Sequence, residues 1–206
     1  MLHAWNLFFL ANFAAVCLCC KKVAHLYEYF YEIVLDIKDV KNVKSALQQF
    51  FSREAEAQSN MECKRCFRTL YYKTHSIHDP PNVLILVLNR FDESCQEKIE
   101  KKVKFPRMLN LKPFLTHPYK GNLMYNLYAI IVHTGEDCDK GSYHCYVKAG
   151  DTYWYKKKNE VVNETLLWAV LRQKAYILFY IRYALNTCFA RQTGYLNFFI
   201  LDLLFE

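Results

Sequence analysis

Alternating apolar and polar residues predict β-strands along most of this chain. From Tyr31 to Ile37 the odd positions are apolar and most even positions are charged, which is the pattern of a half-buried strand. Val83–Leu88 is continuously apolar, so we expect a strand that is buried on both faces. Similar patterns predict strands at residues 69–77, 125–131, 143–149, 153–157 and 175–181, and a further strand in or near a hairpin at 97–104.

Two short helices interrupt the strands. Val43, Ala46, Leu47, Phe50 and Phe51 recur at helical spacing, and this helix should start near Asn42. A second helix, over residues 164–171, is predicted with Asn163 as its N-cap. Residues 52–60 are a polar connector, and turns are expected at 79–81 and 149–151. The predicted fold class is therefore α+β, mainly antiparallel.

The two ends of the chain are apolar but weakly patterned. Leu7–Val16 is too short to span a bilayer, and no Lys or Arg precedes it as in a signal peptide. A targeting segment, a buried strand and a start foreign to the domain remain open for these residues. Residues 183–206 are either a C-terminal helix or a tail that does not belong to the fold.

Composition restricts the class of protein. With 206 residues, 53% of them hydrophobic, the chain can form one domain with a proper core, and disorder is not expected. A net charge of +7 favours a solvated basic surface, and an acidic partner is the alternative interpretation. Because no basic stripe interleaved with aromatic residues is present, we expect no nucleic acid as a partner, and no membrane span.

Nine cysteines are present, and four of them form two widely separated Cys-x-x-Cys pairs. Such pairs suit a metal in a reducing compartment better than a disulfide framework. Two thiolates from each turn can close a tetrahedral zinc site without an open position, so one structural zinc ion is predicted. Buried free cysteines are the alternative, and Cys19 is expected to be a bystander. The candidate ligands are Cys17, Cys20, Cys63 and Cys66.

Several segments in one order resemble the ubiquitin-specific proteases, the cysteine-type deubiquitinases of the peptidase C19 type. They are ILVLNRF, KFPRMLNLKPF, YNLYAIIVHTG, GSYHCYVK, YWYKK and AYILFYIR. The resemblance runs from Cys17 to Arg182 and is nearest to the branch with the nucleolar and cytokine-inducible enzymes. It implies a hand-like fold of which this chain carries the fingers and palm, with the two cysteine pairs in the zinc ribbon of the fingers. The helical thumb is missing.

The resemblance also implies a chemistry that this chain lacks. The family hydrolyses the isopeptide bond after ubiquitin with a cysteine nucleophile, a histidine base and an Asp or Asn that orients the histidine. The box that holds the nucleophile is absent here. The family's Gly-His-Tyr motif corresponds to Gly141-Ser142-Tyr143, so a serine holds the place of the base. Lys158 and Asn159 occupy the family's Asp/Asn positions.

Two histidines near this motif, His133 and His144, are further candidates for a functional role. His144 faces the same way as Ser142, but it lies about 6.6 Å further along the strand, and the preceding loop gives no slack. It is a poor substitute base and is expected to be a plain strand residue. His133 matches a family residue beside the ubiquitin cleft, but it suits a structural role as well. Lys156, Lys157 and Lys158 make this edge basic. Ubiquitin's tail is basic as well, so the like charges would repel each other, and this argues against ubiquitin cleavage as the function.

We therefore expect a partial ubiquitin-specific protease domain at residues 17–182, without activity, flanked by divergent segments at 1–16 and 183–206. Ubiquitin or a ubiquitinated protein is a weakened partner, and a second protein is expected to cover the palm. The expected location is intracellular, nuclear or cytoplasmic. Two alternatives remain, a zinc-ribbon interaction module and a pseudogene-derived fragment without an enzymatic role.

Overall fold

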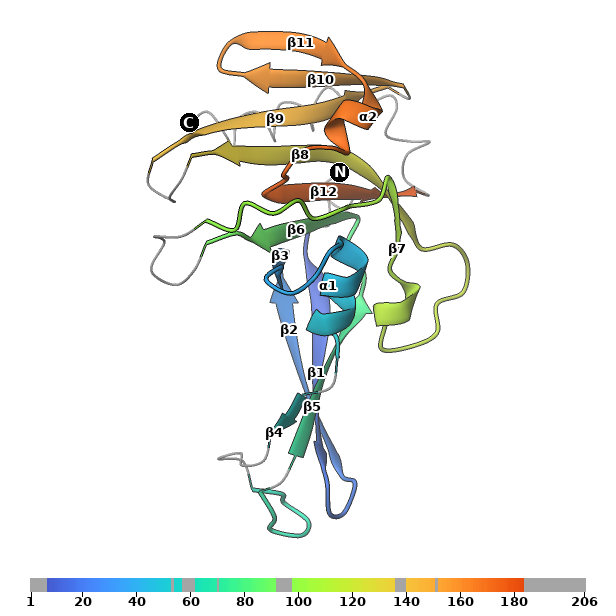
Figure 1. The fold of residues 1–206 in the computed structure, drawn as a ribbon. Coiled ribbons are helices and arrows are strands. Elements are labelled where there is room, and N and C mark those ends of the chain that lie inside the picture. Colours follow the sequence, from blue (N-terminus) through green and yellow to red (C-terminus); the bar gives the residue numbers. More distant parts are fainter. Residues whose placement is uncertain are drawn as a thin grey trace.

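The strands of the chain form two sheets that stand end to end (Figure 1). The computed structural model describes residues 7–52, 54–56, 62–69, 71–91, 98–135, 140–150 and 152–183. The expectations for residues 184–206, for Glu97 and for the turn residue Asp151 lie outside this part. Among the described residues no helix is long and apolar enough to cross a membrane.

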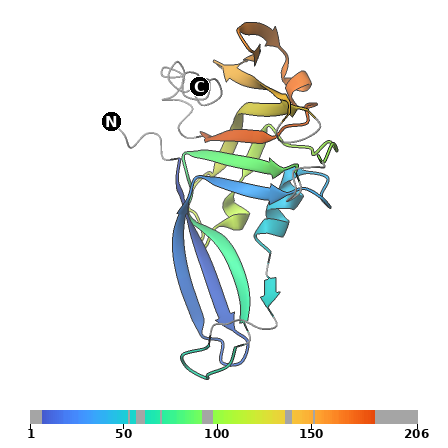
Figure 2. The ribbon, with the colours of Figure 1, turned by 90° about the vertical axis from the view of Figure 1, so that its left-hand side faces the viewer.

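The smaller sheet, the fingers, has four antiparallel strands in the order β2-β1-β5-β4. Its strands are β1 (Phe9–Cys17), β2 (Val23–Phe30), β4 (Glu54–Glu56) and β5 (Tyr71–Asp79). β1 is central and pairs with both β2 and β5, so the apolar run at Leu7–Val16 is a buried strand. Figure 2 shows the three long strands side by side.

Two strands of the fingers were not predicted. β2 is an edge strand whose residues are almost all exposed, so no apolar face marks it in the sequence. β4 lies inside the stretch that we predicted as a polar connector, and it pairs only with β5. Both strands exist because a neighbouring strand supplies their ladder hydrogen bonds, β1 for β2 and β5 for β4, which the pattern within one strand does not reveal.

The larger sheet, the palm, has eight strands. Seven follow the order β11-β10-β9-β8-β12-β6-β3, and β7 pairs with β8 beside this path. The strands are β3 (Glu32–Asp36), β6 (Val83–Asn89), β7 (Met108–Asn110), β8 (Met124–Thr134), β9 (Ser142–Ala149), β10 (Tyr153–Lys158), β11 (Val161–Thr165) and β12 (Ile177–Arg182). β3 and β6 run parallel and the other pairs are antiparallel, which agrees with the predicted fold class.

The helices are short. α1 (Val43–Phe50) begins as predicted, because the Asn42 side-chain oxygen accepts the Ser45 N–H at 2.9 Å. The turn η2 (Lys112–Phe114) follows β7. The predicted cap of the second helix is wrong, because Asn163 lies in β11 opposite Lys156. α2 (Leu167–Val170) starts after Leu166 without a side-chain cap.

The strand predicted at 97–104 is also absent from the described residues 98–104, which make only isolated bridges. A side chain takes the place of a ladder partner here. The buried guanidinium of Arg90 donates to the carbonyls of Ile99 at 2.7 Å and Lys101 at 3.0 Å. These carbonyls are therefore satisfied without a neighbouring strand.

Apolar side chains fill both faces of the palm. The main core continues from the palm into the fingers beneath α1. A second cluster lies on the opposite face of β8, β9 and β12, and Leu7 packs against it. This contact supports the idea that the N-terminal segment helps to cover the palm, whereas residues 195–205 lie outside the described part.

Candidate functional site

The two cysteine pairs meet at the far end of the fingers. The four Sγ atoms of Cys17, Cys20, Cys63 and Cys66 all lie within 4.8 Å of one another. The Cys17 and Cys66 sulfurs are 3.5 Å apart, as are those of Cys20 and Cys63. Cys19 is exposed and is not part of the cluster. The fold therefore brings together four thiols that the chain separates.

The two turns that carry these thiols have the same backbone. In each, the first cysteine donates its N–H to the carbonyl five residues later (Cys17 to Lys22 at 2.9 Å, Cys63 to Arg68 at 2.9 Å). In each, the residue after the second cysteine has a positive φ (Lys21 at 59°, Phe67 at 55°). Neither residue is a glycine, so each has a backbone conformation that is unfavourable for its side chain. Both turns accept this cost and thereby reach the same local geometry.

This geometry favours thiolates. Backbone N–H groups of Arg65 and Cys66 donate to Cys63 and lower its pKa to about 6. The N–H of Cys20 contributes most to the lowered pKa of Cys17. Converging N–H groups of tight turns stabilise negative charge. Four close thiols, two of which ionise readily, fit the donor set of a closed tetrahedral zinc site.

A second group of candidate residues lies where β8, β9 and β10 end together. Ser142 opposes Thr134 across the β8–β9 ladder, and His144 opposes Val132. Directly opposed residues share a face, so Ser142, His144 and Thr134 point to the same side of the sheet. The structure thus places Ser142 and His144 on one face, and the Nδ1 atom of His144 lies 3.4 Å from the Thr134 hydroxyl.

His144 is buried and neutral. Its pKa is lowered to about 4, first because burial disfavours the charged ring and then because Lys156 and Lys158 repel a proton. In the family the residue at Lys158 would carry a carboxylate or an amide. Here it is a cation that acts against an imidazolium on the same face. Asn159 follows in the turn to β11 with a positive φ of 53°, which Asn tolerates well.

His133 points to the opposite face from Ser142. Its ring packs against Tyr143, with centroids 4.8 Å apart, and against Phe91 at 5.4 Å. Gly141 lies so close that a Cβ there would be 2.3 Å from the Nε2 atom of His133. The glycine before Ser142 is thus required by the approach of His133. His133 and His144 are not brought together.

Described cysteines offer no nucleophile at this place. Cys145 is the one described cysteine in the palm sheet. It is next to His144 in β9, so its side chain points to the other face of the sheet. It is buried, and burial raises its pKa, which keeps the thiol protonated.

Sequence reasoning missed one residue that shapes this edge. The Lys98 ammonium donates to the carbonyls of His133 at 3.0 Å and Gly135 at 2.7 Å, and it pairs with Glu100 at 2.9 Å. It therefore holds the end of β8 in place. A lysine in a charged stretch carries no signal for such a role, because most lysines there are solvated.

The charge beside His144 gives a direct test. We expect Lys158→Asp to raise the pKa of His144, because a repelling charge becomes an attracting one. NMR titration of the His144 ring measures this shift. Lys157→Asp is the matched control, since Lys157 opposes Cys145 on the other face and should move the pKa of His144 much less. Equal shifts in the two variants would contradict the arrangement of β10.

Titration of His144 should also affect stability. The unfolded ring has a pKa of roughly 6.5, above the folded value, so the unfolded chain takes up the proton first. The contribution of His144 to folding is thus lost as the pH falls from about 6.5 toward about 4. Lys158→Asp should raise the pKa of His144 in the folded chain, and so narrow the pH range over which this contribution is lost.

Comparisons with known proteins identify the family of this chain. Residues 19–180 match the sequence family described as ubiquitin carboxyl-terminal hydrolase. Ubiquitin carboxyl-terminal hydrolase 42 of Homo sapiens is 38% identical over 168 residues, which cover 81% of this chain and 13% of the relative. Ubiquitin carboxyl-terminal hydrolase 17-like protein B of Mus musculus is 40% identical over 167 residues, covering 79% and 35%. The chain spans about a third or less of these relatives.

Solved structures give the same result. The chain superposes with a TM-score of 0.79 and 28% identity on a structure described as the SAGA DUB module with Ubp8, Sgf11, Sus1 and Sgf73 bound to monoubiquitin. The match covers 86% of this chain and 41% of the other. A second structure of that module, bound to ubiquitin aldehyde, matches with a TM-score of 0.78 and 27% identity. The expected fold is confirmed as part of such a catalytic domain, and the chain belongs to the ubiquitin carboxyl-terminal hydrolase family.

Proposed function

We propose that this chain is a partial ubiquitin-specific protease domain, nearest the nucleolar and cytokine-inducible branch, that does not hydrolyse ubiquitin. One observation carries the proposal. By the resemblance, Ser142 takes the position of the family's catalytic histidine, and Lys158 acts on the neutral His144 on the same face of the sheet. By the resemblance the domain would comprise residues 17–182, with divergent segments at 1–16 and 183–206. Residues 9–16 would nevertheless belong to its fingers sheet, because they form most of β1.

The chemistry supports this inactivity step by step. A hydroxyl at Ser142 cannot accept a proton from a thiol near neutral pH. His144 is uncharged and its ring faces Thr134, but no described cysteine points to that face. The amide of Asn159 could orient an imidazole, but Ser142 leaves no histidine for it to orient, and Lys158 offers neither a carboxylate nor an amide. The nucleophile and the base of the family reaction are therefore unfilled among the described residues.

Zinc would have a structural role in this domain. Cys17 ends β1, Cys20 lies in the turn after it, and Cys63 and Cys66 precede β5, so one ion would join two turns at the same end of the fingers sheet. Four cysteine ligands leave no open position for water or substrate. The ion would thus stabilise the fold and take no part in a reaction.

Ubiquitin remains a weak partner in this proposal. In the two solved structures, the Ubp8 module is bound to monoubiquitin and to ubiquitin aldehyde. In this chain Lys156 and Lys158 lie at the edge that would receive ubiquitin's basic tail, so the tail would be repelled. We therefore place ubiquitin recognition in the fingers and palm, away from the tail, and the protein in the nucleus or cytoplasm.

A second candidate is a zinc-ribbon module that binds another protein. The observation in its favour is the edge strand β2, where Leu26 is 57% and Tyr29 is 72% exposed. Large apolar side chains on an edge strand suit contact with a partner. A second protein that covers the palm belongs to the same proposal. A pseudogene-derived fragment would instead fail to yield soluble, cooperatively melting protein.

A titration with ubiquitin separates the two candidates. We expect weak, saturable chemical-shift changes in labelled ubiquitin at high micromolar to millimolar chain concentration. Ubiquitin that lacks its C-terminal tail should bind at least as well, because the repulsion from Lys156 and Lys158 is removed. The absence of any shift at millimolar concentration would refute ubiquitin binding, and a strong preference for the intact tail would contradict the repulsion.

A further inference from the structure

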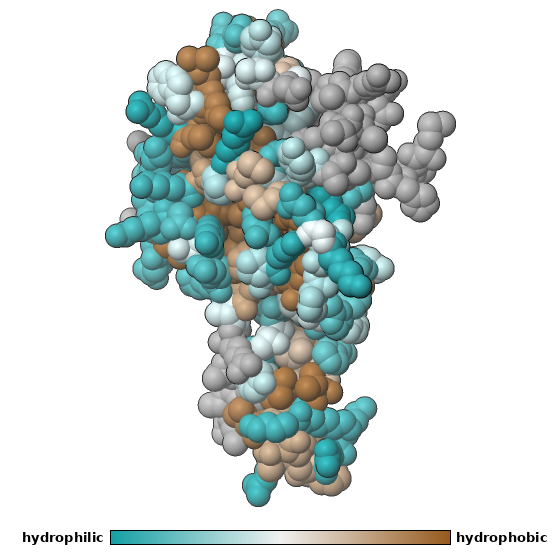
Figure 3. All heavy atoms as spheres, turned by 90° about the vertical axis from the view of Figure 1, so that its right-hand side faces the viewer, coloured by the Kyte–Doolittle hydropathy of each residue, from teal (hydrophilic) through white to brown (hydrophobic). Residues whose placement is uncertain are grey.

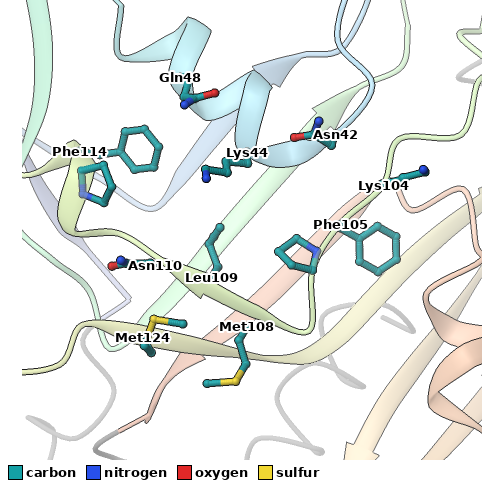
Figure 4. Close-up of a pocket in the computed structure, with 12 residues that line it drawn as sticks. Asn42, Lys44, Gln48, Lys104, Phe105, Met108, Leu109, Asn110, Phe114 and Met124 are labelled. Atoms are coloured by element: carbon teal, nitrogen blue, oxygen red, sulfur yellow. The ribbon is translucent and has the colours of Figure 1, made fainter.

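A half-open pocket lies between α1, the segment around β7, and η2 (Figure 4). Its volume of about 450 Å³ is within the range of natural ligand sites. The lining is mainly apolar and comes from Pro106, Leu109, Pro113, Phe114 and Met124. Figure 3, viewed from the side where β7 lies in Figure 1, shows apolar residues among hydrophilic ones. The pocket is separate from the zinc cluster and from Ser142.

The polar groups at this pocket are mainly hydrogen-bond donors, and the Gln48 amide can both donate and accept. The Asn42 side-chain oxygen already accepts the Ser45 N–H at 2.9 Å, and that of Asn110 accepts the Lys112 N–H at 3.0 Å. Their amide NH₂ groups remain for a ligand. Lys44 extends from α1 toward the pocket in Figure 4, whereas the Lys104 amine points away from it. None of the described lining residues is acidic. A ligand that fits must supply acceptors, and a negative charge is favoured.

The start of α1 adds to this preference. Lys44 lies in the first turn, which contains no acidic residue. A helix N-terminus has a positive partial charge, so a lysine there is unfavourable on its own. An anion next to Lys44 would interact favourably with both charges. The apolar lining of the pocket then offers space for a large apolar group beside that anion.

The free edge of β7 points to a peptide as the occupant. Hydrogen bonds between the flanks of β7 and β8 fall on every second residue (Leu127 N–H to Arg107 O at 2.8 Å, Leu111 N–H to Leu123 O at 3.3 Å). By this alternation Leu109 bonds to Tyr125, and the main chain of Met108 and Asn110 points away from β8. No described strand pairs with that edge. Figure 4 shows the β7 residues across the pocket from Lys44 and Gln48.

We infer that this pocket binds an extended, acidic segment of a partner protein. The segment would pair with the outer edge of β7 at Met108 and Asn110, as in β-strand addition. A large apolar side chain would enter the pocket over Pro106 and Phe114, and a neighbouring Asp or Glu would lie at Lys44. The charge of the pocket distinguishes this partner from ubiquitin's basic tail, so the inference does not depend on ubiquitin binding.

Selection from a phage library of random short peptides on the full chain tests this. We expect the selected pool to be enriched in Asp or Glu next to aromatic or aliphatic residues. A fluorescent copy of the best peptide should bind Lys44→Glu roughly tenfold more weakly, because an attracting charge becomes a repelling one. Lys22→Glu, which makes the same change of net charge on the fingers, should leave its affinity unchanged.

The edge of β7 has its own pair of variants. Met108→Pro removes the outward N–H without removing a hydrogen bond to β8, and it should weaken binding of the peptide. Met108→Leu keeps this N–H and should keep the affinity for the peptide. Thermal melting of each variant shows that the fold is kept. The inference is overturned by a pool without acidic residues, by no selected peptide at all, or by binding that is unaffected by both Lys44→Glu and Met108→Pro.

Discussion

Replacing Cys63 with serine will remove the bound zinc and unfold the fingers. Elemental analysis of the wild-type chain should give about one zinc per chain, and the variant should hold almost none. Structural zinc sites contribute on the order of 10 kcal/mol to folding, so the loss exceeds the whole stability of a typical domain. Removal of the metal by a chelator should lower the melting temperature of the wild type in the same way.

The neighbouring Cys19 offers a matched control. It lies in the other cysteine-bearing turn, between the ligands Cys17 and Cys20, but it is exposed and outside the cluster of four sulfurs. Cys19→Ser should therefore keep the zinc and the melting temperature of the wild type. The assignment of the four cysteines as zinc ligands would be refuted by a folded wild-type chain that contains no zinc, or by equal zinc loss in Cys63→Ser and Cys19→Ser.

The second large effect is an absence of catalysis. The chain should release no fluorophore from a ubiquitin C-terminal amide above the rate of the buffer. General-base catalysis alone contributes a factor of roughly 10²–10⁴ to such a reaction, and the described residues on the face of Ser142 include neither a suitable base nor a cysteine. We expect the same result for the double variant Ser142→His with Lys158→Asp, since it restores a base and its partner but no nucleophile.

Cysteine variants identify the source of any turnover. Activity that survives replacement of every cysteine outside the two pairs would come from a contaminating enzyme. Activity that disappears when one of these cysteines is replaced, Cys145 among them, would refute the proposed inactivity. Zinc content and melting temperature should be unchanged in the double variant, because Ser142 and Lys158 lie far along the chain from the four thiols and on another sheet.

Local patterns in the sequence predicted much of the fold correctly. The helix α1 with its Asn42 cap and the strands β3, β6 and β8 follow apolar periodicities that neighbouring residues alone produce. The predictions failed where a partner outside the segment itself decides the structure. β2 exists through its ladder to β1, and the carbonyls of residues 99 and 101 bond to Arg90 instead of forming a strand.

Sequence by itself determined the family and the candidate chemistry of the chain. The order of its motifs identifies the family, the spacing of the cysteines predicts the donor set, and the resemblance implies that Ser142 takes the position of the family's base. Residue identity is enough for these predictions, because a serine hydroxyl is not a base near neutral pH.

The tertiary structure alone decided which residues meet. It brought the Cys17 and Cys66 sulfurs to 3.5 Å, and it buried His144 near Lys156 and Lys158, so that first burial and then these two charges lower the pKa of that ring. It also left the outer edge of β7 open beside Lys44. Such contacts depend on strand pairing between distant segments, and each pairing is selected by the burial of the whole sheet and not by the residues of one strand.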